Sequence, residues 1–136
     1  MTKNYIDKLA YIEIQNKKVL VTLSKGKDTW YIPGGKRDSG ESDQQALIRE
    51  VKEELQIDLV PDSIKKYEIF EAPAHGKPKG TVVRMTCYTA KYSGEIKPDS
   101  EIEKIAYFNF AQKAQTSPVD HLIFDDLKDK ELIKSK

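Results

Sequence analysis

Three glutamates, Glu50, Glu53 and Glu54, lie close together in this chain and follow a turn rich in glycine. If their segment is helical, Glu50 precedes the other two by three and four residues, which places the carboxylates on one helix face. Like charges at this spacing repel one another by roughly 0.2–0.5 kcal/mol per exposed pair. The cluster therefore has two interpretations: an ordinary charged helix, since Glu is a good helix former, or a helix that binds a cation.

The glycine turn favours the second interpretation. Residues 33–41 read Pro-Gly-Gly-Lys-Arg-Asp-Ser-Gly-Glu. Gly34 and Gly35 let the backbone turn tightly and approach an ion or a ligand closely. A carbonyl oxygen from this turn and the helix carboxylates would form the all-oxygen ligand set that Mg²⁺ or Mn²⁺ prefers. The turn differs from the phosphate-binding loop of nucleotide triphosphatases, because the Lys-Ser/Thr pair of that loop is absent.

Length and charge limit the class of protein. A chain of 136 residues is expected to fold as one domain, residues 1–136, with a real core. A net charge of +1 gives no reason to expect binding to nucleic acid or a membrane. A single cysteine excludes an internal disulfide, and no signal peptide or long apolar run occurs. We expect a cytoplasmic protein that is a monomer or a homodimer and acts on a small molecule.

The apolar pattern predicts strands, a helix, more strands and a second helix, a mixed α/β (α+β) domain. A turn over residues 16–18 joins the first two strands, and the first helix begins near Glu41 or Ser42. Residues 73–80 form a loop, and the mixed charges after residue 127 predict a frayed end. The predicted strands are residues 10–14, 19–23, 30–32, 66–72, 81–92 and 105–110, and a second helix, with Leu122, Ile123 and Leu127 on its apolar side, begins at Ser117-Pro118.

Residues 35–57 resemble the signature of the Nudix hydrolases. The match consists of Gly35, five residues, Glu41, seven residues, and then Arg-Glu-Val-x-Glu-Glu-x-x-Ile over residues 49–57. Gln56 is the one departure, because the family usually has glycine there. Glycine would favour a left-handed cap at the end of the helix. Gln56 therefore bears on the sharpness of that turn and not on the metal site, since no ligand is lost.

The resemblance implies a fold, a chemistry and a set of residues. The fold is a mixed, curved β-sheet sandwiched between helices, and the reaction is hydrolysis of a nucleoside diphosphate linked to another group. Glu50, Glu53, Glu54 and the carbonyl of Gly34 are implied ligands of Mg²⁺, for which Mn²⁺ can substitute. One of the glutamates, directly or through metal-bound water, acts as the base. Arg49 pairs with Glu53 or Glu41 and holds the carboxylates in place.

A late carboxylate also reaches the metal ions in MutT-like members of the family. Glu101 stands in the closer matching position and Glu103 is the second choice, although both also fit solvated loop acids. Lys36, Arg37 and Arg84 are candidates for contacts with phosphate. For each of these three side chains, a surface or structural role is the alternative.

The substrate is less well specified. Asp120, near the start of the last helix, could accept from a purine edge and Phe124 could stack on the base, but Asp120 or Ser117 could equally cap the helix. His75 is a candidate for a phosphate contact or a general base, whereas Trp30 and Tyr31 fit the core better. We expect a nucleoside triphosphate, an oxidised purine nucleotide among the candidates, to be cleaved to the monophosphate and pyrophosphate. Hydrolysis of ADP-ribose or another nucleoside diphosphate derivative, for which Pro73 is a weak indication, and an inactive nucleotide-binding module are the alternatives.

Overall fold

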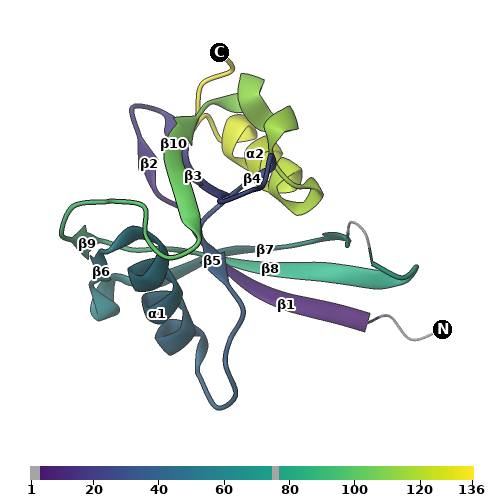
Figure 1. Cartoon of the computed structure of the whole chain (residues 1–136). Coiled ribbons are helices and arrows are strands. Elements are labelled where there is room, and N and C mark those ends of the chain that lie inside the picture. Colours follow the sequence, from purple (N-terminus) through teal and green to yellow (C-terminus); the bar gives the residue numbers. More distant parts are fainter. Residues whose placement is uncertain (1–3, 75–76) are drawn as a thin grey trace.

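The structure is a computed structural model that describes residues 4–74 and 77–136 (Figure 1). The longer elements are β1 (Asn4–Tyr11), β3 (Lys18–Ser24), α1 (Asp43–Leu55), β7 (Lys65–Pro73), β8 (Thr81–Thr89), β10 (Ile102–Phe108) and α2 (Pro118–Asp129). The shorter elements are β2 (Ile14–Gln15), β4 (Trp30–Tyr31), β5 (Gly34–Gly35), β6 (Asp58–Leu59), β9 (Tyr92–Ser93) and the 3-10 turns Pro61–Ser63 and Phe110–Gln115.

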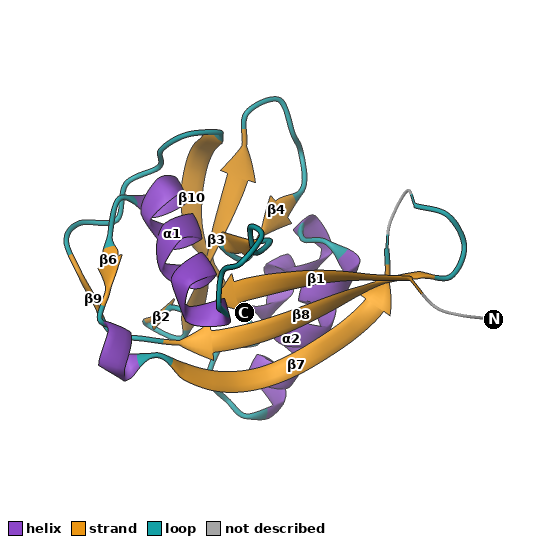
Figure 2. Ribbon diagram, turned by 90° about the horizontal axis from the view of Figure 1, so that it is seen from below, coloured by secondary structure: helices purple, strands orange, loops and turns teal. Residues whose placement is uncertain are grey.

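The first sheet has the strand order β5-β1-β8-β7 and lies between the two helices. Figure 2 shows α1 and α2 on opposite faces of the curved strands β1, β8 and β7, which extend beyond the helices at one end. β1 and β8 run parallel, whereas the other neighbours are antiparallel. The predicted mixed, curved sheet between helices is thus confirmed. A second sheet of β10, β3 and β2, with β4 paired to β3, stands beside α2 in Figure 1.

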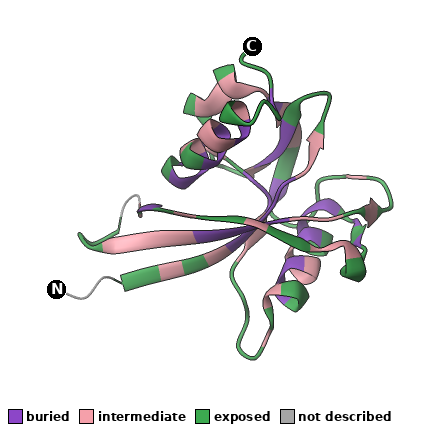
Figure 3. Ribbon diagram, turned by 180° about the vertical axis from the view of Figure 1, so that it is seen from behind, coloured by how far each residue is buried: buried purple, intermediate pink, exposed green. Residues whose placement is uncertain are grey.

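Both faces of the first sheet are covered by apolar side chains, because neighbouring residues of a strand point to opposite faces. Leu9 belongs to the cluster that contains Leu47 and Val51 of α1. Ala10, the next residue, belongs to the cluster that contains Ile123 of α2. Figure 3 shows buried residues where the strands pass between the helices and exposed ones toward the free end of β1. The two cores hold the sheet and both helices in fixed positions.

The N-terminal strand differs from its prediction. Residues 10–14 were expected to pair with residues 19–23, but β1 starts at Asn4 and pairs along its length with β8. Only the two residues of β2 form the hairpin with β3. Its turn residues Asn16 and Lys17 have φ values of 52° and 57°, which suits a two-residue turn of a twisted hairpin. Residues 9–12 are at most 4% exposed, as a central strand requires, and an edge hairpin would expose them.

Two later strands also have other bounds than predicted. The strand expected over residues 81–92 ends at Thr89, and residues 92–93 leave the first sheet to pair with β6. The strand expected over residues 105–110 begins at Ile102 and ends at Phe108, with a bulge between Ile102 and Lys104. Strand pairing with distant segments sets these limits, which the local pattern does not reveal.

Helix α1 begins where the sequence predicts. Ser42 is its N-cap and forms a reciprocal capping box with Gln45. At the other end Gln56 takes the left-handed conformation, with φ 61° and ψ 27°, and its N–H donates to the carbonyl of Lys52. The sharp turn for which the signature usually has glycine is therefore formed here by a glutamine. The left-handed backbone of this residue costs roughly 1–2 kcal/mol.

The last helix begins at Pro118 as predicted, but two expectations about the C-terminal region are wrong. Leu122 is 38% exposed, and Val119, Ile123, Phe124 and Leu127 form the buried side instead. The tail is not frayed, because Ile133 is only 3% exposed and packs in the core beside α2. The backbone of Lys134 donates to Lys17 and accepts from Phe110.

Replacement of Gln56 by glycine is predicted to stabilise the protein. Glycine adopts the left-handed conformation without strain, and part of the gain is lost because glycine is more flexible in the unfolded chain. We expect Gln56→Gly to raise the free energy of unfolding by about 0.5–1 kcal/mol in urea denaturation. Gln44→Gly, within α1, is the control and should destabilise by about 1 kcal/mol. A Gln56→Gly variant that is less stable than the wild type would contradict the prediction.

Candidate functional site

The glycine turn is attached to the first sheet. Gly34 and Gly35 form β5, which pairs antiparallel with β1 so that Gly35 lies opposite Leu9 and Gly34 opposite Ala10. Gly34 has a φ of 145°, and a Cβ atom there would lie 1.9 Å from the carbonyl oxygen of Leu9. No side chain fits in so small a space. The pairing therefore requires glycine at this position.

The same two glycines contact the carboxylates of α1. The N–H of Gly34 donates to Glu54 Oε1 at 3.0 Å. A Cβ atom on Gly35 would lie 2.5 Å from the carboxylate of Glu50, so the missing side chain is what lets Glu50 approach the turn. The turn and the helix face, predicted separately from the sequence, are thus one site.

Arg49 holds the acidic side chains together. Its guanidinium binds both oxygens of Glu41 at 2.8 Å and donates to Glu50 at 3.0 Å and to Glu53 at 3.4 Å. It also donates to the carbonyl of Lys36 at 3.1 Å, which ties the loop before the helix to the cluster. The hydrogen bonds from Arg49 lower the pKa of Glu41 to about 2. Of the two partners predicted for Arg49, Glu53 and Glu41, the structure has both.

The carboxylates differ strongly in their surroundings. Glu54 is 7% exposed, and burial raises its pKa to about 8. The hydrogen bond from Gly34 lowers this pKa, whereas the charges of Glu50 and Glu101 raise it further. Burial also raises the pKa of Glu50, which Arg49 opposes. The side chain of Glu53 is 51% exposed. A buried acid beside two others favours either a proton or a bound cation.

Glu101 lies near this cluster because the loop before β10 is fixed to the end of α1. The N–H groups of Lys97 and Asp99 donate to the free carbonyls of Leu55 and Glu54, at 2.9 and 3.0 Å. The charge of Glu101 contributes to the raised pKa of both Glu50 and Glu54. Glu103, the second choice, is exposed at the β-bulge.

The donor set suits a hard divalent cation. Carboxylate oxygens from α1 and Glu101, with a carbonyl of the glycine turn, are the ligands that Mg²⁺ and Mn²⁺ take in proteins. Among residues 4–74 and 77–136, no three His, Cys, Asp or Glu side chains are arranged as a ready ligand cage. Glu54 bonds to Gly34 and Glu50 to Arg49 instead. Burial, and after it the charges of Glu50 and Glu101, raise the pKa of Glu54. A cation among these carboxylates would offset their repulsion, so the donor set fits the ion.

Two cavities open beside the site. The turn cavity, of about 180 Å³, is lined by Gly34, Gly35 and Glu54. The β1–α2 cavity, of about 230 Å³, lies between the free end of β1 and β8 and the start of α2, with walls such as Val83 and Val119. Lys8, Tyr31 and Met85 line both cavities. One ligand could therefore reach from the carboxylates to α2.

Of the three basic residues predicted to bind substrate, only one lines a cavity beside the site. Lys36 lines the β1–α2 cavity. Arg37 lines neither cavity and bonds to Asp43 at 2.6 Å. Arg84 is also outside them: it donates to Glu71 at 2.9 Å and its guanidinium lies 4.0 Å from the centre of the Tyr5 ring. The charge of Arg84 is thus paired with Glu71 on an exposed part of the sheet, and its contact with phosphate stays a prediction.

Asp120 is fully buried at the start of α2. Its Oδ2 accepts from Ser117 Oγ at 2.8 Å, and its Oδ1 has no partner among the described residues. Burial raises the pKa of Asp120 to about 7, which the bond from Ser117 opposes. Ser117 is the N-cap residue of α2, but neither its side chain nor that of Asp120 forms a capping hydrogen bond, so the capping alternative is not confirmed. Asp120 retains one free acceptor oxygen among the described residues.

Two aromatic side chains were assigned wrongly from the sequence. Phe124 has no exposed surface and packs in the core, so it cannot stack on a base. Tyr31, expected in the core, is 40% exposed and lines both cavities. Trp30 packs on Phe108 with ring centres 5.0 Å apart, as expected for a core residue. His75 lies outside the described residues.

Lys8 lines both cavities, although the sequence pattern did not predict a place for it beside the site. Lys8 stands between Ile6 and Ala10 on the face of β1 that carries core residues. A lysine at an inward position of a strand is unusual, and that alternation is the signal that could have found it. It went unnoticed because the strand was predicted to begin only at residue 10.

Sequence relatives support a Nudix assignment. The chain is 27% identical to the Nudix hydrolase YvcI of Bacillus subtilis over 124 residues, 89% of this chain and 78% of that protein. It is 27% identical over 100 residues to an ADP-ribose pyrophosphatase of Methanocaldococcus jannaschii, 72% of this chain and 57% of the relative. It is also 30% identical over 99 residues, 73% of this chain, to the mRNA-decapping enzyme subunit 2 of Saccharomyces cerevisiae, but spans only 10% of that protein.

Solved structures and a family model agree with these relatives. A putative Nudix hydrolase from Chromobacterium violaceum superimposes with a TM-score of 0.72 at 25% identity, over 95% of this chain and 80% of the other. A MutT Nudix hydrolase from Burkholderia pseudomallei gives 0.71 at 21% identity, over 93% and 98%. Residues 9–127 match the family model of the NUDIX domain, a range that includes the glycine turn and the glutamate helix. The chain belongs to the Nudix hydrolase family, enzymes that act on pyrophosphate bonds in substrates that contain a nucleotide.

Proposed function

We propose that this protein hydrolyses a phosphoanhydride bond of a purine nucleoside triphosphate, giving the monophosphate and pyrophosphate. The observation that carries the proposal is the contact between the glycine turn and α1. It gathers a buried carboxylate, Glu54, a half-buried one, Glu50, and an exposed one, Glu53, beside a cavity that can hold a diphosphate. A surface salt-bridge network would need neither the glycines nor the burial.

The proposal includes a divalent metal ion, which Nudix hydrolases generally need. Glu50, Glu53, Glu54, Glu101 and the carbonyl of Gly34 would hold Mg²⁺, or Mn²⁺ in its place. When bound, the ion neutralises phosphate oxygens and makes a water molecule more acidic.

The other residues bind and orient the substrate. Glu53 and Glu50 are the proposed bases, because Glu53 is exposed to water and Glu50 lies beside the turn. Arg49 fixes both carboxylates through its bonds to them and to Glu41. Lys36, at the edge of the β1–α2 cavity, would contact a phosphate oxygen, and Arg37 would do so only if its bond to Asp43 opens.

The β1–α2 cavity is the proposed nucleoside site. Its apolar wall suits a base and sugar. Asp120 is fully buried next to the cavity-lining residues Ser117 and Val119, and its free oxygen would accept from the amino or imino edge of a purine if the start of α2 opens to the ligand. A second candidate substrate is ADP-ribose, which the archaeal relative and the position of Pro73 on the wall of this cavity support. The intact set of glutamates argues against an inactive nucleotide-binding module.

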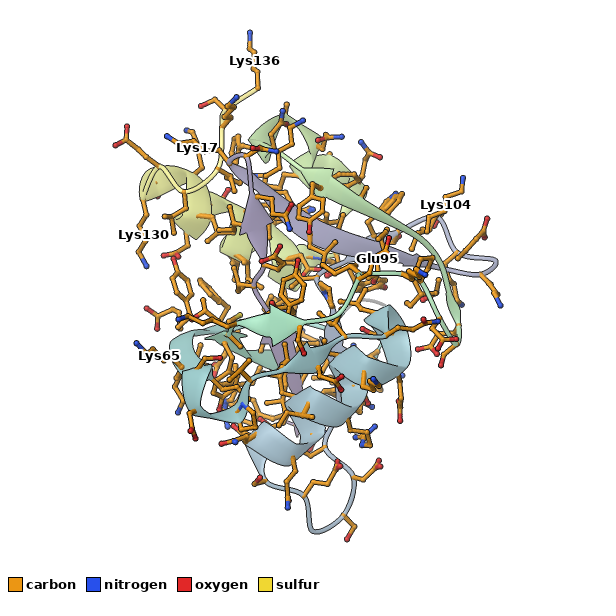
Figure 4. The ribbon with its side chains drawn as sticks, turned by 90° about the vertical axis from the view of Figure 1, so that its left-hand side faces the viewer. Lys17, Lys65, Glu95, Lys104, Lys130 and Lys136 are labelled. Carbon is orange, nitrogen blue, oxygen red and sulfur yellow. The ribbon has the colours of Figure 1, made fainter. Side chains whose placement is uncertain are left out.

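A small substrate is favoured over a nucleic acid. The net charge of +1 gives little bulk attraction to a polyanion, and Lys104 lies on the opposite side of the molecule from Lys65 and Lys130 (Figure 4). The decapping relative acts, by its name, on mRNA, but the chain covers a tenth of that protein. No helix among the described residues is long and apolar enough to cross a membrane. The enzyme is proposed to work as a monomer or a homodimer.

The proposal is tested with purified protein, Mg²⁺ and a panel of canonical and oxidised nucleoside triphosphates, ADP-ribose and dinucleoside polyphosphates. Products are separated by anion-exchange chromatography, which distinguishes release of pyrophosphate from release of phosphate. We expect the monophosphate and pyrophosphate from a purine triphosphate. Turnover of ADP-ribose alone would select the second candidate, and no turnover of any compound would reject the enzyme function.

Loss of one carboxylate at the site should affect turnover and leave the fold intact. We expect Glu53→Gln and Glu54→Gln to lower kcat by about 10²- to 10⁴-fold, because each removes a proposed metal ligand or base. Glutamine at position 54 can still accept from the Gly34 N–H, so thermal stability should be unchanged or higher. Glu68→Gln, on the exposed side of β7, is the matched control and should retain full activity. A large loss of stability in Glu54→Gln would instead indicate a structural role.

The buried acids predict a stability that falls as the pH rises. Without divalent ions, folded Glu54 keeps its proton up to a pKa of about 8, whereas an unfolded glutamate loses it near 4.5. This contribution is therefore complete below about pH 4.5 and disappears as the pH rises through 8, with a slope of at most about 1.4 kcal/mol per pH unit. Asp120, with a pKa of about 7 in place of 3.8, acts in the same direction. Urea denaturation in EDTA should show a smaller decrease between pH 5.5 and 7.5 for Glu54→Gln than for the wild type.

Divalent ions should restore the stability that the wild type loses as the pH rises, and should restore much less of it in Glu54→Gln. Binding of Mg²⁺ to the ionised carboxylates stabilises the folded state by mass action, more at pH 7.5 than at pH 5.5. We expect added Mg²⁺ to raise the melting temperature of the wild type at pH 7.5 and to change that of Glu54→Gln much less. Equal shifts for the two proteins would contradict the assignment of Glu54 as a ligand.

A further inference from the structure

Lys8 lies where the two cavities meet. It is on β1, two residues before Ala10, and its side chain is on the sheet face that carries the α2 core. Lys8, Tyr31 and Met85 line both the turn cavity and the β1–α2 cavity. Of these three, only Lys8 carries a charge. Lys36 and Lys77, the other lysines at these cavities, line the β1–α2 cavity alone.

The ammonium group of Lys8 has no partner of opposite charge in the part of the chain that the structure describes. No described residue accepts a hydrogen bond from its Nζ or lies within ion-pair distance of it, and the Tyr31 ring centre is 6.0 Å away. Lys8 is nevertheless partly buried. An ammonium removed from water without a partner is unfavourable, and burial together with the charge of Lys36 lowers the pKa of Lys8. The charge of the buried Asp120 opposes this shift, but Asp120 bonds to Ser117.

An anion between the cavities would supply the missing partner. The proposed substrate has its base and sugar in the β1–α2 cavity and its diphosphate at the glutamates, so the phosphoryl group next to the sugar must pass the shared wall. We propose that Lys8 binds this sugar-proximal phosphoryl group and positions the substrate across the two cavities. This inference rests on the proposed function, and it adds a substrate-contacting residue that lies outside the glutamate helix and its turn.

A lysine is suited to such a contact. Its ammonium is a compact charge with three donors on a flexible stem, which can follow a phosphoryl group as the bond to the leaving group breaks. Negative charge on the phosphoryl oxygens is stabilised by nearby cations, most strongly where water is excluded. The half-buried position of Lys8 meets that condition, whereas the exposed Lys36 does so less.

The experiment measures binding separately for each part of the ligand. Isothermal titration calorimetry, with Ca²⁺ in place of Mg²⁺, compares the wild type with Lys8→Met and Lys8→Gln. The probes are guanosine and adenosine, their 5′-monophosphates, and the α,β-methylene diphosphates of both. We expect both variants to bind the monophosphates and methylene diphosphates roughly 10- to 100-fold more weakly than the wild type, and the nucleosides equally well. Lys66→Met, an exposed lysine of β7, should bind all probes as the wild type does.

Three results would overturn the inference. Equal affinity of the wild type and Lys8→Met for the methylene diphosphates would show that Lys8 does not contact phosphate, and the proposed function would stand without it. An equal loss for nucleosides and nucleotides would assign Lys8 to the base or to the shape of the cavity. A wild type that binds none of the nucleotides would reject the proposed function and this inference together. Melting curves accompany each titration, and Lys8→Met should melt at the same temperature as the wild type or higher, because an unpaired buried charge is removed.

Discussion

The hydrogen bond from the Gly34 N–H to Glu54 joins a β-sheet to a helix, and the rest of the site depends on it. Gly34 and Gly35 belong to the edge strand β5 and pair with the central strand β1, so the turn is as fixed as the sheet. Glu54 belongs to a helix whose apolar side is buried against the same sheet. Because both partners are held by separate long-range contacts, the carboxylate is kept at the turn although its burial is unfavourable.

The site concentrates negative charge, and the surrounding structure compensates only part of it. Arg49 neutralises Glu41 with two short bonds and shares its remaining donors between Glu50 and Glu53. No comparable partner reaches Glu54, whose only hydrogen bond comes from a neutral backbone group in the described part of the chain. A proton therefore stabilises the arrangement below the Glu54 pKa of about 8, and the proposed divalent ion would take the place of that proton. The two apolar cores supply the stability that this cluster reduces.

The sequence predicts the local parts of this site well and the distant parts poorly. The spacing of Gly35, Glu41, Arg49 and the glutamates identifies a loop and a helix that are adjacent along the chain, so contacts within them follow from helix geometry. The location of Glu101 depends on the loop that bonds to the last carbonyls of α1. The burial of Asp120, the position of Lys8 at the cavities and the packing of Ile133 depend on contacts between segments that are far apart in the sequence. Gln56 forms the left-handed turn at the end of α1 although its residue type does not favour that conformation, so the residue type alone does not predict the turn.

The same contrast applies to the proposed reaction and to the proposed choice of substrate. The residues that would hold the metal ion and act on the phosphoanhydride come mostly from the continuous segment 34–54. The walls of the β1–α2 cavity come instead from β1, β4, β8 and the start of α2, which the parallel pairing of β1 with β8 brings together. β1 is common to both, because Leu9 and Ala10 pair with the glycine turn while Lys8 faces the cavities. If the substrate binds as proposed, a change in the first strand would alter both which nucleoside is bound and how its phosphoryl groups meet the glutamates, whereas a change in α2 would affect the nucleoside alone.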